Sequence, residues 1–167
     1  MVFLENEMMY GVEFDVAAEH VDPNFVLPIG KAHTERVGTD VTITAHAKMV
    51  GHALKAAEIL KAEHDIDCEV INLRSLRPLD RPAIVESVKK TNRIVNVEEG
   101  WPQHGIGAEI AALLMESEAF DYLDAPMERV CGADVPMPYA QSIEAMAVPQ
   151  IPDIVKGVLN ACYRNAK

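Results

Sequence analysis

The chain has 167 residues, 49% of them hydrophobic and 25% charged, which is the composition of an ordinary globular domain with one core. No segment approaches the roughly 18 consecutive apolar residues of a membrane-spanning helix, so we expect no membrane partner. The net charge of −11, from 26 acidic and 15 basic side chains, repels phosphates and anionic lipids and excludes nucleic acid as an expected partner.

The first 39 residues differ in character from the rest of the chain. Val2, Phe3 and Leu4 form an apolar, strand-like run directly after the initiator methionine. Because a strand needs neighbours, we expect either that the chain is the later portion of a longer protein or that Met1 begins an incomplete gene. Residues 11–39 are broken by prolines and glycine and predict a linker that wraps against the domain. The N-terminus has neither a secretory nor a transit-peptide pattern, so we expect no targeting signal within the chain.

Strand and helix patterns alternate from residue 40 onward. Short β-branched or apolar runs predict strands over residues 40–47, 68–73, 93–99 and 127–132. Apolar residues with helical spacing predict a helix after each strand, over residues 48–64, 80–92, 105–120 and 152–162. Repeated strand–helix units predict a three-layer α/β domain over residues 40–167, with a mostly parallel sheet and helices on both faces.

Two of the predicted helices carry local signals that the structure can test. Asp80 precedes the second helix as an expected N-cap. In the third helix we expect the buried stripe to consist of Ile110, Ala111, Leu114 and Met115.

The stretch EEGWPQHGIGAEI, residues 98–110, begins with the last two residues of the third predicted strand, at the end of the sheet where ligands of α/β proteins bind. Gly105 and Gly107 match the opening of a dinucleotide-binding fingerprint, but Ile110 replaces its third glycine and two carboxylates precede it. The alternative is that the glycines let the chain turn tightly and let the following helix lie close to the sheet.

The polar residues of this stretch have both catalytic and structural interpretations. Glu98 and Glu99 could act as a general acid and base, but adjacent residues at a strand end point to opposite sides, so at most one would act. The structural alternative is a solvated strand end or a salt bridge to a neighbouring subunit. His104 could transfer a proton, although surface histidines without a role are commoner.

Metal and disulfide chemistry find no support in the sequence. The chain's six histidines have no metal-binding spacing, and its three cysteines are widely separated, which predicts buried, reduced thiols.

Four segments resemble the β subunit of the pyruvate dehydrogenase E1 component: LENEMMYG (4–11), VINLRSLRPLD (70–80), NVEEGWPQHGIGAEI (96–110) and GADVPMPYA (132–140). They follow the family's order with compatible spacing and cover essentially the whole chain. The wider family of thiamine diphosphate enzymes with a transketolase-type C-terminal domain shares the LRPLD-like loop and the glutamate-then-GxG turn. The GWPQ and GADVPMPYA segments resemble the pyruvate branch of this family rather than the branched-chain 2-oxo acid branch.

The resemblance implies an oxidoreductase of the mitochondrial matrix, an α₂β₂ heterotetramer that decarboxylates pyruvate and acetylates lipoamide for acetyl-CoA synthesis. It also implies that residues 1–10 are the last strand of a pyrimidine-binding domain. The diphosphate of thiamine diphosphate and its Mg²⁺ are expected on the α subunit, and the residues that contact the aminopyrimidine are expected on that first domain. No catalytic, cofactor-binding or metal-binding residue is therefore carried over to this chain, and the isolated chain is expected to be inactive.

The resemblance implies three partners: the E1 α subunit, a second β subunit and the subunit-binding domain of dihydrolipoyl acetyltransferase, which is typically basic. Docking of that domain is expected around Asp124 and near Lys167, although the C-terminal YRNAK departs from the family's apolar ending. His104 stands where an aromatic residue is common. A subunit interface is expected to include Glu98, Glu99, Trp101 and His104.

Three alternatives stay open at this point. The chain could be a non-catalytic assembly and docking module, or part of a branched-chain 2-oxo acid dehydrogenase β subunit. It could also be an unrelated flavodoxin-like protein, which would bind a nucleotide or flavin and ignore the other partners.

Overall fold

The structure, a computed structural model, describes residues 2–163. A five-stranded sheet forms its centre, in the order β1-β3-β2-β4-β5. All neighbouring strands are parallel except β1, which pairs antiparallel with β3 at one edge. The strands are β1 (His33–Arg36), β2 (Val41–Ala45), β3 (Cys68–Asn72), β4 (Ile94–Val97) and β5 (Glu128–Val130).

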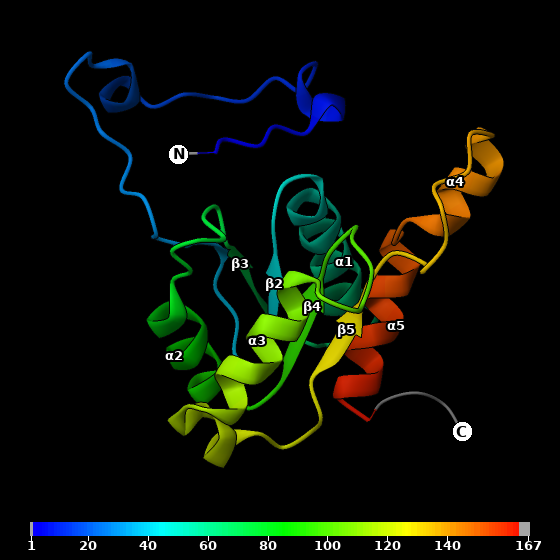
Figure 1. Cartoon of the computed structure of the whole chain (residues 1–167). Coiled ribbons are helices and arrows are strands. Elements are labelled where there is room, and N and C mark those ends of the chain that lie inside the picture. The colour runs from blue at the N-terminus through cyan, green and yellow to red at the C-terminus, as the bar shows by residue number, and fades with distance from the viewer. Residues whose placement is uncertain (1, 164–167) are drawn as a thin grey trace.

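Helices cover both faces of this sheet (Figure 1). One face packs against α1 and α5, and the other packs against α2, α3 and the 3₁₀ helix η3. The predicted three-layer α/β architecture is confirmed. The helices are α1 (Lys48–His64), α2 (Arg81–Thr91), α3 (Ile106–Met115), α4 (Gln141–Ala147) and α5 (Ile151–Ala161), with 3₁₀ helices η1 (Glu7–Met9), η2 (Ala18–Val21) and η3 (Glu118–Tyr122).

The central strand β2 shows how the alternation of side chains builds the two faces. Val41, Ile43 and Ala45 are fully buried in the apolar layer beneath α1 and α5. Thr42 points to the other face, where its hydroxyl bonds to Ser87 (2.6 Å) and Thr91 (2.7 Å) of α2. Hydrogen bonding of these hydroxyls removes the cost of burying them.

The predicted N-cap of α2 is confirmed, because the Asp80 carboxylate accepts a hydrogen bond from the Ala83 N–H at 3.4 Å. Its second oxygen accepts the Ala32 N–H at 3.0 Å. One buried side chain therefore starts α2 and fixes the chain that enters β1.

Several exposed segments differ from the prediction. Residues 33–36, placed in the linker, form the edge strand β1, and Gln141–Ala147 form α4 within the proline-rich loop. Val2, Phe3 and Leu4 are more than 80% exposed and form no strand, since they have no neighbouring strand to pair with. Residues 7–29 are exposed and stand away from the domain instead of wrapping against it (Figure 1).

Two details of the predicted core are also wrong. In α3, Leu113 is buried beside Ile110 and Leu114, whereas Met115 is 58% exposed. Cys68 is buried, but Cys131 and Cys162 are only partly so. Among residues 2–163, no helix combines the length and the apolar composition needed to cross a bilayer.

Two helical glycines give a matched test of how closely α5 lies against the sheet. A methyl group on Gly51 of α1 would meet nothing within 4 Å, whereas one on Gly157 of α5 would come 2.7 Å from Val130 Cγ2 of β5. We expect Gly51→Ala to raise the free energy of unfolding by about 0.5–1 kcal/mol through helix propensity. Gly157→Ala should lower it by about 1–2 kcal/mol, because overpacking outweighs that gain. Urea unfolding measures both, and equal stabilisation by the two variants would contradict the close approach of α5.

Candidate functional site at the carboxyl end of the sheet

The strand order places the candidate site at the carboxyl ends of β2 and β4. From β2 the chain passes through α1 to β3 on one side, then crosses through α2 to β4 on the other side of β2. Ligands of open α/β sheets bind where the strand order reverses in this way. His46 directly follows β2 here, and Glu98 and Glu99 directly follow β4.

The side chain of Glu98 lies at the amino end of α3. Its side chain is buried, with only 3% of the residue exposed. The carboxylate accepts hydrogen bonds from the backbone N–H groups of Ile106 (2.9 Å) and Gly107 (3.0 Å), so it satisfies two donors that a helix start leaves unpaired. The positive end of the helix dipole favours the negative charge at this position.

The glycines of the turn are required by the position of this carboxylate. A methyl group on Gly105 would lie 2.5 Å from Glu98 Oε2, and one on Gly107 would lie 2.8 Å from Glu98 Oε1. The steric interpretation of these glycines is therefore favoured over the nucleotide-binding one. A phosphate would need the same N–H groups that Glu98 already uses.

A buried polar chain connects Glu98 to the neighbouring strand. Asn96 Nδ2 donates to Glu98 Oε1 at 3.1 Å, and Thr44 Oγ1 of β2 donates to Asn96 Oδ1 at 3.0 Å. The Cys131 thiol also faces Glu98 Oε1, at 3.7 Å. Burial, reinforced by the Glu98 charge, raises the pKa of Cys131 to about 11, so this cysteine stays a thiol and is a poor nucleophile.

Glu99 points away from Glu98, toward the surface, as the strand-end argument predicts. Its carboxylate accepts a hydrogen bond from Asn6 Nδ2 at 3.3 Å, which fastens the N-terminal segment to the end of β4. Trp101 is 52% exposed, and His104 is exposed with a left-handed backbone (φ 61°). Arg129 of β5 donates to the Pro102 carbonyl and holds the turn in place.

The expected interface residues therefore divide into two sets. Glu99, Trp101 and His104 lie at the surface, where a partner could contact them. Glu98 does not, because its carboxylate is buried and bonded within its own domain. We correct its expected position from the subunit interface to the domain interior.

His46 is a member of this site that the sequence reasoning missed. It is half-buried, and its Nδ1 has no hydrogen-bond partner among the described residues. Burial lowers the pKa of His46, while the charges of Glu98 and Glu99 oppose that shift. Its position at the carboxyl end of the strand predicted over residues 40–47 was the available signal, the same one that singled out the two glutamates.

The two expected docking residues lie elsewhere. Asp124 is near the amino ends of β4 and β5, at the opposite end of the sheet, where its backbone N–H bonds to the Asn92 carbonyl. Its side chain is 57% exposed and pairs with Arg93 Nη2 at 3.4 Å. Lys167 lies outside the described residues.

The described part of the chain offers no group of three His, Cys, Asp or Glu side chains placed to hold a metal ion. The N–H groups at the start of α3 could in principle hold a diphosphate, but Glu98 fills that position. A diphosphate cofactor with its Mg²⁺ therefore does not fit this site.

Glu98→Gln tests the importance of the buried carboxylate. The amide replaces one acceptor oxygen by a donor that faces N–H groups, so we expect the free energy of unfolding to fall by about 2–3 kcal/mol. The neighbouring Glu99→Gln is the control and should change it by less than about 0.5 kcal/mol. Equal effects in urea unfolding would contradict the assignment of the helix start to Glu98.

Comparison with known proteins identifies the family of this fold. The family model described as "Transketolase, C-terminal domain" matches residues 30–154. A pyruvate dehydrogenase E1 component subunit beta-2, mitochondrial, from Oryza sativa subsp. japonica is 63% identical over 98% of this chain, which covers 43% of that protein. The corresponding mitochondrial subunit beta from Mus musculus is 57% identical over 95% of the chain and 44% of its own length.

A solved structure agrees with this assignment. It is described as a split gene transketolase, inactive beta4 tetramer, and it superimposes with a TM-score of 0.72 at 30% identity, over 87% of this chain and 45% of the other. The chain thus spans less than half the length of the curated relatives that it matches. The match of sequence and fold over most of the chain shows that it belongs to the transketolase C-terminal domain family.

Proposed function

We propose that the chain is the transketolase-type part of a pyruvate dehydrogenase E1 β subunit. The whole enzyme would be an oxidoreductase that decarboxylates pyruvate and transfers the acetyl group to lipoamide, on the route to acetyl-CoA. The supporting observation is the 63% identity with such a β subunit over 98% of this chain. The relatives' names also support a mitochondrial location, which we propose to be the matrix.

Enzymes of the transketolase family depend on thiamine diphosphate. In the proposed enzyme this cofactor supplies the carbanion chemistry of decarboxylation, and Mg²⁺ neutralises its diphosphate. Because Glu98 fills the anion position of the candidate site, we propose that the cofactor is bound outside this chain, on the α subunit and on the pyrimidine-binding domain. The chain itself would serve assembly and docking.

Three partners follow from this proposal: the E1 α subunit, a second β subunit and the subunit-binding domain of dihydrolipoyl acetyltransferase. Assembly from copies of one chain is supported by the solved relative, which is described as a beta4 tetramer. Side chains at the surface beside the carboxyl end of the sheet would contribute to these subunit contacts, namely those of Glu99, Trp101 and His104.

Docking of the acetyltransferase domain would use the acidic segment around Asp124. This segment, residues 116–124, carries four carboxylates and no Lys or Arg. It suits a basic partner, and we keep Lys167 as a second proposed docking position. Asp124 is more than half exposed, so a partner could compete for it with Arg93.

A non-catalytic assembly module is the second candidate function. It is favoured by one observation, the description of the solved relative as inactive. Such a module would bind the same partners without supporting turnover.

A chimeric enzyme separates the two candidates. The matching region of the Oryza sativa β subunit is replaced by this chain, and the chimera is co-expressed with its α subunit. We expect assembly, and pyruvate decarboxylation within about tenfold of the parent enzyme, with slower turnover of branched-chain 2-oxo acids. The 167-residue chain alone should give no heat of thiamine diphosphate binding in calorimetry. An assembled but inactive chimera would favour the module, and a failure to assemble would contradict both functions.

Asp124→Arg tests the docking proposal. Reversing the charge should weaken binding of the acetyltransferase domain about tenfold or more, because it also places a cation beside Arg93. Glu58→Arg on the exposed face of α1 makes the same change of charge and should leave the affinity unaltered. Calorimetric titration of each full-length chain measures both constants, and an unchanged affinity for Asp124→Arg would remove it from the docking site.

A further inference from the structure

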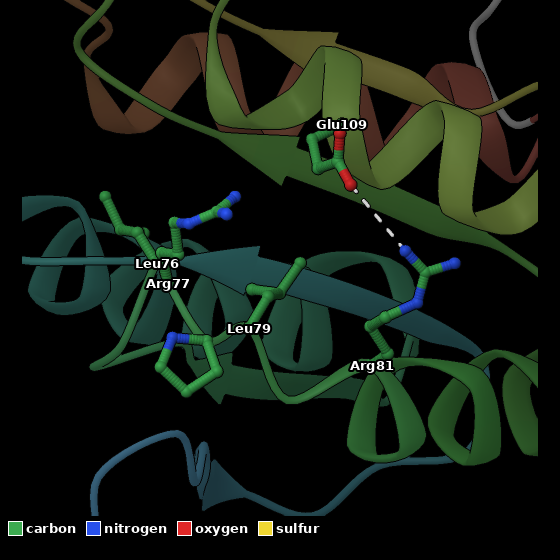
Figure 2. Close-up of a pocket in the computed structure, with 6 residues that line it drawn as sticks. Leu76, Arg77, Leu79, Arg81 and Glu109 are labelled. Atoms are coloured by element: carbon green, nitrogen blue, oxygen red, sulfur yellow. Dashed lines mark ion pairs between the residues drawn. The ribbon is translucent and has the colours of Figure 1, made fainter.

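A hollow of about 580 Å³ opens beside the carboxyl end of β3, and neither Glu98 nor Asp124 lines it. The loop between β3 and α2 forms one side of it, and Glu109 of α3 stands on the other. Figure 2 shows Arg81 and Glu109 facing one another across this hollow, with Leu79 between Arg81 and the Leu76–Arg77 corner. We call it the Arg77 hollow; its lining consists of Leu76, Arg77, Pro78, Leu79, Arg81 and Glu109.

The Arg77 hollow presents an exposed cation, which is unusual in this acidic chain. Arg81 pairs with Glu109 and Glu116, each at 3.6 Å. Arg77 is exposed and forms no ion pair or side-chain hydrogen bond within residues 2–163. A chain with a net charge of −11 thus presents a guanidinium without a partner among these residues, beside apolar leucine surface. This combination suits a ligand that carries an apolar side chain next to a carboxylate.

The chain itself contains a segment of that chemistry. Residues 2–28 hold six Asp and Glu and no Lys or Arg. Within them, residues 12–16 read Val-Glu-Phe-Asp-Val, and the three apolar side chains are uncovered: Val12 is 57% exposed, Phe14 80% and Val16 51%. Such a concentration of exposed apolar side chains marks a contact surface.

Residues 12–16 do not line the hollow of their own chain, although one end of their segment is attached beside it, at Pro78. Asn6 bonds to Glu99, and at the other end Gly30 lies against Pro78, so close that a methyl group on it would come 2.7 Å from the proline ring. Between these two attachment points the segment projects from the domain (Figure 1). Because the segment projects between its two attachment points, the exposed side chain of Phe14 is accessible to another molecule.

We propose that residues 12–16 of a second copy of this chain dock in the Arg77 hollow. Phe14 packs on the leucines, and a neighbouring carboxylate pairs with Arg77. The inference rests on the pairing of copies proposed above and specifies its contact. In an extended conformation with three residues per turn, neighbouring side chains diverge by about 120°, so Glu13 or Asp15 reaches the rim when Phe14 points inward. Two-fold symmetry would form the contact twice, once in each direction.

Sedimentation velocity on the 167-residue chain tests this contact. We expect a concentration-dependent dimer with a dissociation constant of about 1–100 µM, weakened as NaCl rises from about 50 to 500 mM. Arg77→Glu and Phe14→Ala should each raise the dissociation constant about tenfold or more. The double variant Glu13→Lys/Asp15→Lys should do the same, and adding Arg77→Glu to it should restore affinity to within about threefold of the original.

The control is Lys55→Glu on the exposed face of α1, which makes the same change of charge as Arg77→Glu and should leave the dimer intact. A wild-type chain that stays monomeric at about 100 µM would overturn the pairing of copies together with this inference. A wild-type dimer that Arg77→Glu and Phe14→Ala weaken no more than Lys55→Glu does would overturn the docking in the hollow alone. Circular dichroism of each variant checks that the fold is retained.

Discussion

The buried carboxylate of Glu98 is the interaction on which the carboxyl end of the sheet depends. It ends β4, starts α3 and connects through Asn96 to β2. A buried charge is tolerated only when it is well bonded, and here the donors are two backbone N–H groups and an amide. The need for small residues at 105 and 107 follows from this position, as does the fixed path of the turn that exposes Trp101 and His104.

Helices and strands that bury an apolar face were predictable from the sequence, because burial of one face makes apolar residues recur at the spacing of a helix or a strand. Helix α1 spans the predicted residues 48–64, and strands β2 to β5 lie within their predicted ranges. The elements that were missed are exposed. β1 reads His-Thr-Glu-Arg with no apolar alternation, and α4 buries only Ala147 of its seven residues. The formation of β1 and α4 depends on contacts with neighbouring strands and loops, and a local sequence pattern does not predict such contacts.

The candidate site was predictable in position but not in orientation. The strand-end rule identified Glu98 and Glu99 and predicted that they diverge. Two structural features decide which glutamate points inward: the pleat of β4 and the space beside Gly105 and Gly107. Neither feature can be predicted from the sequence. The resemblance supplied Asp124, yet only the topology reveals that it lies at the opposite end of the strands from Glu98.

This separation of surfaces has a consequence for assembly. Strands of four to five residues are about 15 Å long, so a partner bound near Asp124 and one bound at the carboxyl end do not compete for the same side chains. The two surfaces differ in charge around Asp124 and Arg77, although Glu116 of the acidic segment pairs with Arg81 of the hollow at 3.6 Å. A basic partner is attracted to the first surface and repelled from the second. If both proposed contacts form, the mostly parallel sheet would hold the two partners at opposite ends of its strands.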